Sequence, residues 1–293
     1  MSLQAATQSA GGHVRVSGVF LVVTSMALLT INDVLMKLLV AGMPLGQAVA
    51  MRGAAGCAIM IVAAPWLGGL EALRPRSLRN AAVLSSLLLI ALFLFPWSLQ
   101  RMPIADGIML VSLSPVLAAM LSPWMLKERV GWRRWMAILL GLFGAVLVID
   151  PGGADAGWVM LVPLIVALIV ALRDVLTRSY IAAESVLALV FAANVFSVVA
   201  GAATLPYAAI TPDALQWGYI WVTGSLMTIS LAMTTAAFQR TGAVTVSCLK
   251  YSAIIWAALL GWLIWGDRLT MADWTGAVLI TVSGVVIAMR TRA

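Results

Sequence analysis

The chain has 293 residues, of which 63% are hydrophobic and only 10% are charged, and its mean hydropathy is +1.05. A water-soluble domain of this size could not expose so apolar a surface without aggregating, so the composition indicates a chain that faces lipid. The net charge of +7 is spread over several short loops and both tails, which argues against a nucleic-acid-binding surface.

The apolar segments predict an all-α integral membrane protein with ten transmembrane helices. A bilayer core of roughly 30 Å needs about 20 apolar residues in a helix, so the stretches between charged or Pro/Gly-rich breaks are interpreted as spans. The first span is too long for a signal peptide and contains Asn32, Asp33 and Lys37, so we expect it to be retained. The short loops leave no room for a soluble domain. The predicted spans are 17–40, 44–65, 78–99, 104–126, 132–149, 157–179, 185–205, 213–238, 243–265 and 274–290.

Two internal similarities indicate that the chain is a duplication. INDVLMK at 31–37 is echoed by LRDVLTR at 172–178. We therefore predict two domains, namely a first repeat at 1–150 with an N-terminal tail at 1–16, and a second repeat at 151–293. The further matches are Gln100 and Arg101 with Gln239 and Arg240, Glu128 and Arg129 with Asp267 and Arg268, and Trp135 with Trp274.

An odd number of spans per repeat predicts that the two repeats are inverted. Five crossings bring the second copy in from the opposite side, so a pseudo-two-fold axis should lie in the membrane plane. Inverted five-helix repeats are typical of secondary transporters, although a purely structural duplication is the alternative. With a cytoplasmic N-terminus, twelve of the 18 Lys and Arg residues lie on the inner side, so we expect both termini to be cytoplasmic.

Ionisable residues lie at membrane depth in the first, second and sixth spans. Each such charge costs some kcal/mol unless it is paired or hydrated, so these side chains should face protein or water. One hypothesis treats them as structural ion pairs; the other makes Asp33 a binding site for a proton or for the ammonium group of a substrate. The candidate pairs are Asp33 with Arg52 or Lys37, and Asp174 with Arg173 or Arg178.

The fourth and ninth spans carry further candidates for substrate binding. Lys250 could bind a substrate carboxylate, with Tyr251 beside it, or could extend to the cytoplasmic interface instead. The counterpart of Tyr251 in the fourth span is Ser112, which is followed by Ser114 and Pro115. Proline removes a backbone hydrogen bond, so a kink is expected there, either to expose a carbonyl group to a cavity or only to suit packing.

Aromatic and hydroxyl side chains in the third and eighth spans suit the mouth of a cavity. Phe93 and Trp97 lie in the outer half of the third span, and Thr234 lies in the inner half of the eighth. Trp97 could instead belong to the belt of aromatic residues at the membrane interface.

Several chemistries are disfavoured by the residues that the spans lack. The only histidine, His13, lies in the N-terminal tail, so no histidine triad or histidine metal cluster is expected within the membrane. Cys57 and Cys248 both lie inside spans and do not form a secreted disulfide framework. No phosphate-binding GxxxxGK[ST] loop is present. We therefore expect neither cofactor nor metal, and a gradient as the driving force; a membrane-embedded enzyme or a channel is the distant alternative.

Taken together, these features resemble the EamA family of the drug/metabolite transporter superfamily. The resemblance covers essentially the whole chain, and its overall length and compact loops are similar to the YddG type of bacterial amino-acid exporter. The features that carry it are ten apolar helices in two inverted repeats, the pairs Glu128-Arg129 and Asp267-Arg268 before the fifth helix of each half, and Trp135 and Trp274 at its start.

The resemblance implies a bacterial inner-membrane protein, monomeric or homodimeric, that exports amino acids and related metabolites. A multidrug or other small-metabolite transporter is the alternative. The family's central cavity would be lined by the first, third, fourth, sixth, eighth and ninth helices. Because Ile254 stands at the counterpart of Pro115, a kink is expected in only one of the two helices. Carried over position by position, the resemblance places near the substrate path Asn32, Phe93, Trp97, Ser112, Ser114, Thr234 and Tyr251.

Overall fold

The computed structural model describes residues 3–66, 68–125, 132–149, 157–180, 184–240, 246 and 249–289. The described residues form α-helices that are joined by turns and three short 3-10 segments, and none of them lies in a β-strand. The first half contains α1 (Leu3–Gly42), α2 (Leu45–Ala63), α3 (Leu78–Leu99), α4 (Ile104–Val111), α5 (Ser114–Met125) and α6 (Trp132–Ile149). The second half contains α7 (Leu161–Tyr180), α8 (Val186–Ala202), α9 (Ala214–Arg240), α11 (Ser252–Trp265) and α12 (Met271–Met289).

These helices account for the ten predicted membrane spans. Six apolar stretches are long enough to cross a membrane, and four shorter apolar helices accompany them. Each of these ten stretches falls on one predicted span, so the predicted fold class is confirmed. The long stretches are Gly18–Gly42, Leu45–Trp66, Leu78–Leu99, Ile104–Leu121, Trp158–Thr177 and Ala214–Ala237; the shorter ones are Trp135–Val148, Val186–Ala202, Ser252–Trp265 and Met271–Ile287.

The first helix is longer than the sequence predicts. We expect a tail at 1–16, whereas α1 is already helical from Leu3. Residues 3–17 contain no proline, so nothing removes a backbone donor from the helix at the point where the apolar stretch begins. The apolar span itself begins at Gly18.

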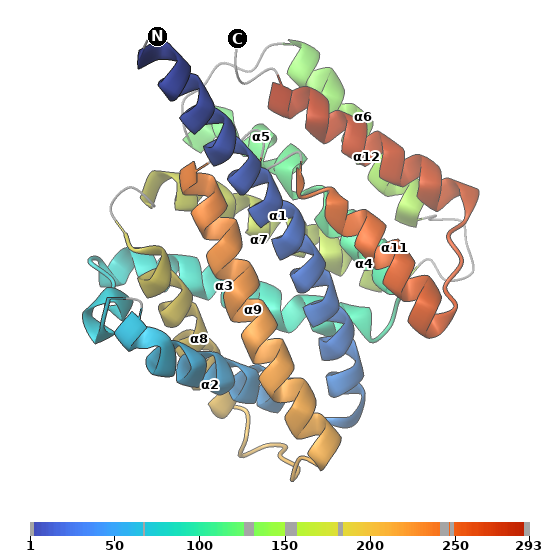
Figure 1. Ribbon diagram of the computed structural model, residues 1–293. Coiled ribbons are helices and arrows are strands. Elements are labelled where there is room, and N and C mark those ends of the chain that lie inside the picture. The colour runs from blue at the N-terminus through green and yellow to red at the C-terminus, as the bar shows by residue number, and fades with distance from the viewer. Residues whose placement is uncertain are drawn as a thin grey trace.

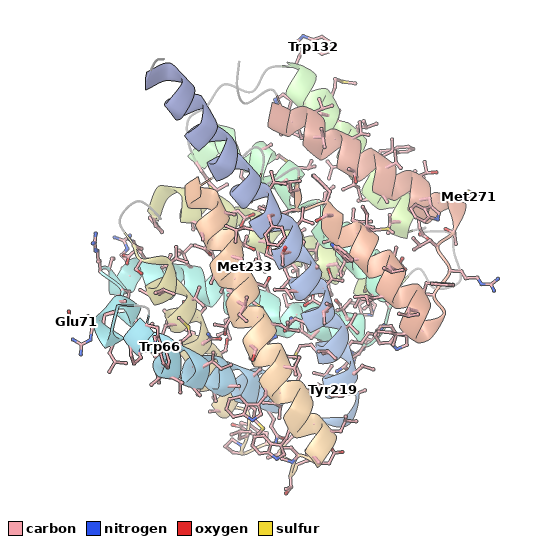
Figure 2. All side chains as sticks on the ribbon, viewed as in Figure 1. Trp66, Glu71, Trp132, Tyr219, Met233 and Met271 are labelled. Carbon is pink, nitrogen blue, oxygen red and sulfur yellow. The ribbon has the colours of Figure 1, made fainter. Side chains whose placement is uncertain are left out.

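The outer surface of the helix bundle is apolar, as contact with lipid requires. On α6, Leu139, Phe143 and Val146 expose about half of their surface, and on α11 Trp262 and Leu263 expose more. Contiguous apolar surface of this kind would drive a soluble protein to associate. Figure 2 shows that side chains cover the periphery of the bundle, with Trp132 at the end of α6 that Figure 1 draws at the top.

The helix contacts follow the two-fold exchange symmetry between the halves that the duplication predicts. Exchanging the halves turns the α1–α9 contact into the α7–α3 contact, and the α5–α7 contact into the α11–α1 contact; all four pairs pack together. The pairs α2–α8 and α6–α12 are their own counterparts, and each of them is in contact. Figure 1 shows α1 beside α9, and α6 beside α12. The two halves are therefore interleaved, not separate.

The fourth and ninth spans are both interrupted near their middle. A turn at Ser112 and Leu113 separates α4 from α5, and the Leu113 N–H bonds to Leu110 O at 3.1 Å, three residues back. A turn at Lys250 and Tyr251 precedes α11, where the Ala253 N–H bonds to Lys250 O at 3.1 Å. The expectation of a kink in only one helix is therefore wrong, because the second break forms without a proline through tightened i→i−3 hydrogen bonds.

Candidate functional site

A cavity of about 180 Å³ lies between the two halves and next to both helix breaks. It has room for on the order of ten water molecules. Its walls come from α1, α2, α3, α4, α5, α7, α9 and α11 and from the turn at Lys250. These walls include every helix that the family resemblance implies, together with α2. The polar side chains that line the cavity are Thr30, Asp33, Arg52, Ser112, Ser114, Arg173, Asp174, Ser230, Thr234 and Lys250.

The remaining wall of the cavity is apolar. On α3 it is formed by Leu88, Leu92 and Phe95, which recur at the spacing of one helix face, and by Pro96. The predicted residues Phe93 and Trp97 lie on the same helix but do not line the cavity. Phe95 thus supplies the aromatic surface that the sequence interpretation places on its neighbours two residues away, because adjacent helix positions point in different directions.

One ion pair crosses the cavity wall between α7 and the second helix break. Lys250 Nζ donates to Asp174 Oδ2 at 2.5 Å, and the side chains are only 15% and 9% exposed. Neither sequence hypothesis includes this pair, since Asp174 was expected to bind Arg173 or Arg178 and Lys250 to bind substrate or reach the interface. The two residues are 76 positions apart, so only the fold could show their contact.

Asp33 lies on α1 and is held by its neighbour. Asn32 Nδ2 donates to Asp33 Oδ1 at 3.0 Å, and Asn32 itself is 1% exposed and absent from the cavity lining. Asn32 is therefore a positioning residue for the carboxylate, not a cavity wall. Arg52 on α2 also lines the cavity and interacts electrostatically with Asp33, although the two do not form a direct ion pair.

Arg173 lies on α7 and borders two cavities. It lines the central cavity and a second, smaller one of about 10 Å³, which has room for about one water molecule. The smaller cavity also exposes the hydroxyl-bearing residues Ser85, Thr177 and Thr235. Within the described part of the chain, Arg173 Nε is buried and has no hydrogen-bond acceptor.

Hydroxyl groups complete the polar lining and join α1 to α9. Ser230 Oγ donates to Ser25 O at 2.7 Å, and Thr234 Oγ1 donates to Ser25 Oγ at 3.0 Å. Ser112 Oγ donates to Ile108 O at 2.7 Å, beside the break between α4 and α5. The candidates Ser112, Ser114 and Thr234 therefore do line the cavity, whereas Ser25, which the sequence interpretation does not single out, holds two helices together at its edge.

Two further predicted site residues, Tyr251 and Lys37, also lie outside the cavity lining. Tyr251 is 4% exposed and packs in the core with Ile254 and Ile280. Its ring occupies the space next to Gly284 on α12, where a Cβ would overlap with the phenol oxygen. Lys37 lies toward the end of α1, where Nζ donates to Met102 O at 2.8 Å. Neither side chain lines the cavity.

Trp97 belongs to an aromatic and cationic cluster at the end of α3. Its ring is tilted by 38° against that of Trp158, with a centroid distance of 5.5 Å, and the Arg101 guanidinium lies 4.1 Å from its centroid. Trp158 is 69% exposed. Trp97 does not line the cavity, and its assignment to the aromatic belt at the membrane interface stays a prediction.

Three further sequence predictions concern Pro115, the Glu128-Arg129 motif and Arg178. Pro115 is buried in the first turn of α5, next to the helix break, and does not line the cavity. The Glu128-Arg129 motif and the side chain of Arg178 lie outside the described residues. Among the described residues, no three His, Cys, Asp or Glu side chains form a group that could hold a metal ion.

Comparison with known proteins gives the family. The chain matches the EamA-like transporter family twice, over residues 16–150 and again over 157–289. It is 26% identical over 281 residues to the pseudopaline exporter CntI of Pseudomonas aeruginosa (strain UCBPP-PA14), covering 93% of this chain and 96% of that one. It is 27% identical over 207 residues to the riboflavin transporter of Rhizobium johnstonii, covering 70% and 68% of the two chains.

A third relative is matched over a shorter part, and a solved structure supports the fold. The S-adenosylmethionine uptake transporter of Rickettsia bellii is 22% identical over 187 residues, and the alignment spans 63% of each chain. One crystal structure superposes with a TM-score of 0.69 at 19% identity, covering 94% of this chain and 98% of the other. The described residues contain ten apolar helical stretches, a cavity lies between the two halves, and the family model matches both halves, so the chain belongs to the EamA-like transporter family.

Proposed function

We propose that this protein is a secondary transporter of the bacterial inner membrane that exports amino acids and related metabolites. The observation that carries the proposal is a cavity with both polar and apolar walls, built between two inverted repeats next to two broken helices. Transporters of this architecture place their substrate sites at the interface of the repeats and use interrupted helices to expose backbone groups there.

The transport cycle we propose is alternating access. Residues 1–150 and 151–293 act as the two repeats, and exchange of their conformations opens the cavity first to one side of the membrane and then to the other. The turns at Ser112–Leu113 and Lys250–Tyr251 interrupt the two spans, so the half-helices on either side can tilt separately. Both termini are proposed to be cytoplasmic.

An amino acid fits the chemistry of the cavity. The charged residues Asp33, Arg52, Arg173, Asp174 and Lys250 can meet the two ionic ends of a zwitterion, while the wall at Leu88, Leu92 and Phe95 suits an apolar or aromatic side chain. One relative is named an exporter and another an uptake transporter, so family membership does not give the direction of transport. Export is therefore part of the proposal.

Asp33 is the proposed coupling residue. Its carboxyl group lines the cavity without a direct ion pair to Arg52, so it can exchange a proton with whichever side the cavity faces. Replacing Asp33 with Asn keeps the shape of the side chain and removes this exchange.

The test is uptake of a panel of labelled amino acids into reconstituted proteoliposomes, with and without a pH gradient. We expect uptake of a subset of the amino acids, accelerated by the gradient in the wild type and insensitive to it in Asp33→Asn. Transport of cationic drugs without transport of amino acids would favour the multidrug alternative. An unchanged pH dependence in Asp33→Asn would exclude Asp33 as the coupling residue.

A further inference from the structure

The charges of the central cavity do not balance. Three cationic side chains line it, Arg52, Arg173 and Lys250, but the only carboxylates among its described lining residues are Asp33 and Asp174. A charge buried in the membrane without a counter-ion costs several kcal/mol, so such an imbalance needs an explanation.

The imbalance lies on the α7 side of the cavity. Arg52 and Asp33 form a balanced set of one cation and one carboxylate. On the other side, Asp174 is engaged by Lys250 at 2.5 Å, and the same carboxylate is the acidic group that acts on Arg173. Two cations therefore share one carboxylate, and Arg173 forms no direct ion pair with it.

The hydrogen bonding of Arg173 also indicates that a negatively charged partner is missing on the α7 side of the cavity. A guanidinium group has five N–H donors in a fixed planar arrangement that matches the two oxygens of a carboxylate. In the described structure, the Nε atom of Arg173 is buried and has no acceptor, and the residue borders the central cavity. A buried donor without an acceptor costs about 1–3 kcal/mol, which an incoming acceptor would recover.

Building on the proposed transport function, we propose that Arg173 binds the carboxylate group of the transported substrate. A bound carboxylate gives the cavity two negative and two positive charges on its α7 side, and it supplies an acceptor for the unpaired donor. One further negative charge is sufficient for this balance. A phosphate ester, with a charge of about −1.5 to −2, would exceed it, so the site selects carboxylates over phosphates.

The binding test compares ligands that share a phenethyl group and differ in the charge of their polar end. We would titrate the purified protein in detergent with 3-phenylpropanoate, its neutral amide 3-phenylpropanamide, and phenethylammonium, and follow the thermal unfolding temperature. The phenyl group suits the apolar wall around Phe95. A ligand that binds only the folded state stabilises it by RT ln(1 + [L]/Kd), so at equal concentration 3-phenylpropanoate should raise the unfolding temperature more than either other compound. Equal shifts with the amide or the ammonium compound, or no shift with the carboxylate at tens of millimolar, would overturn the proposal.

Three variants locate the effect. Arg173→Gln leaves the Asp174–Lys250 pair neutral, so we expect it to fold and to bind 3-phenylpropanoate about ten- to hundredfold more weakly, the loss of one charged hydrogen bond. Arg173→Lys keeps the charge but not the planar donors, and should fall between Gln and wild type. Arg101→Gln removes an exposed arginine outside the cavity and should bind as the wild type does. Unchanged affinity in a folded Arg173→Gln would contradict the proposal.

Transport measurements with the same proteins separate this proposal from the function on which it rests. If the wild type transports amino acids and Arg173→Gln does so with an unchanged KM, the carboxylate site is wrong and the transport function stands. If carboxylates bind through Arg173 but the proteoliposomes accumulate no amino acid, the site stands and the proposed function fails.

Discussion

The Asp174–Lys250 pair shows how a membrane protein holds charge at depth. Its two partners come from different spans of the second half and are nearly enclosed, so each is the main counter-ion of the other. Removing one member of such a pair leaves an uncompensated charge, whereas removing both leaves none.

We therefore expect Asp174→Asn and Lys250→Met to lower the free energy of unfolding by about 3–5 kcal/mol each, and the double variant to recover most of this loss. The measurement is a double-mutant cycle of denaturant or thermal unfolding in detergent. Single effects that simply add in the double variant would show that the pair contributes no coupling energy.

The residues of the site could be predicted from the sequence only in part. Asp33, Arg173 and Asp174 stand out because ionised groups are rare in apolar helices. The rotation of each helix is not determined by its own sequence, so Tyr251 was placed toward the cavity although it faces α12. Pairs between distant residues, such as Asp174 with Lys250, depend on tertiary packing and leave no local signal.

At the scale of the helices, close packing depends on glycine at a few crossings. On α6 and α12, a Cβ at Gly144 would lie 2.9 Å from Gly276 O, closer than real Cβ contacts allow. By contrast, Gly218 on α9 has no atom within 4 Å of the position of a Cβ. The same substitution therefore has opposite consequences at these two sites.

Gly144→Ala should separate α6 from α12 and lower the free energy of unfolding by about 1–3 kcal/mol. Gly218→Ala, the matched control, should leave it unchanged or raise it by about 0.4–1 kcal/mol, because alanine restricts the unfolded chain. Thermal unfolding in detergent measures both. Equal effects at the two sites would mean that the α6–α12 crossing is not close-packed.

The helix boundaries were predicted better than the helix interruptions. The bounds of α3 and α6 coincide with the predicted spans 78–99 and 132–149, because charged and turn-forming residues flank them. The break at Lys250–Tyr251 was not predicted, since Ile254 replaces the proline that marks the equivalent break in the first half. Its i→i−3 hydrogen bonds depend on tertiary packing, so no local sequence pattern predicts them.

At the scale of the whole molecule, the duplication was the feature that the sequence revealed best. Composition requires a membrane, the spacing of apolar stretches gives the number of spans, and five spans per copy require inversion. The exchange-symmetric helix contacts agree with that logic. The side of the membrane on which the chain ends lie stays a prediction, because it depends on loop charges and not on packing.

Figure 1 draws the first turn of α1 and the last turn of α12 on the same side of the bundle. From the distribution of Lys and Arg, we expect reporter fusions at residue 1 and residue 293 both to be active only as cytoplasmic reporters. Reporters on opposite faces would contradict the even number of crossings, and both on the outer face would reverse the predicted orientation.

The symmetry-related contacts α1–α9 and α3–α7 limit how stable the folded protein can be. In a transporter of the proposed kind, these two contacts alternate in closing the cavity on opposite sides of the membrane. If one contact were much more stable than the other, the protein would stay in one conformation and transport would stop. Selection for transport activity therefore limits the stability of both contacts. Thermostable variants would have to gain stability at other helix crossings, such as α6–α12.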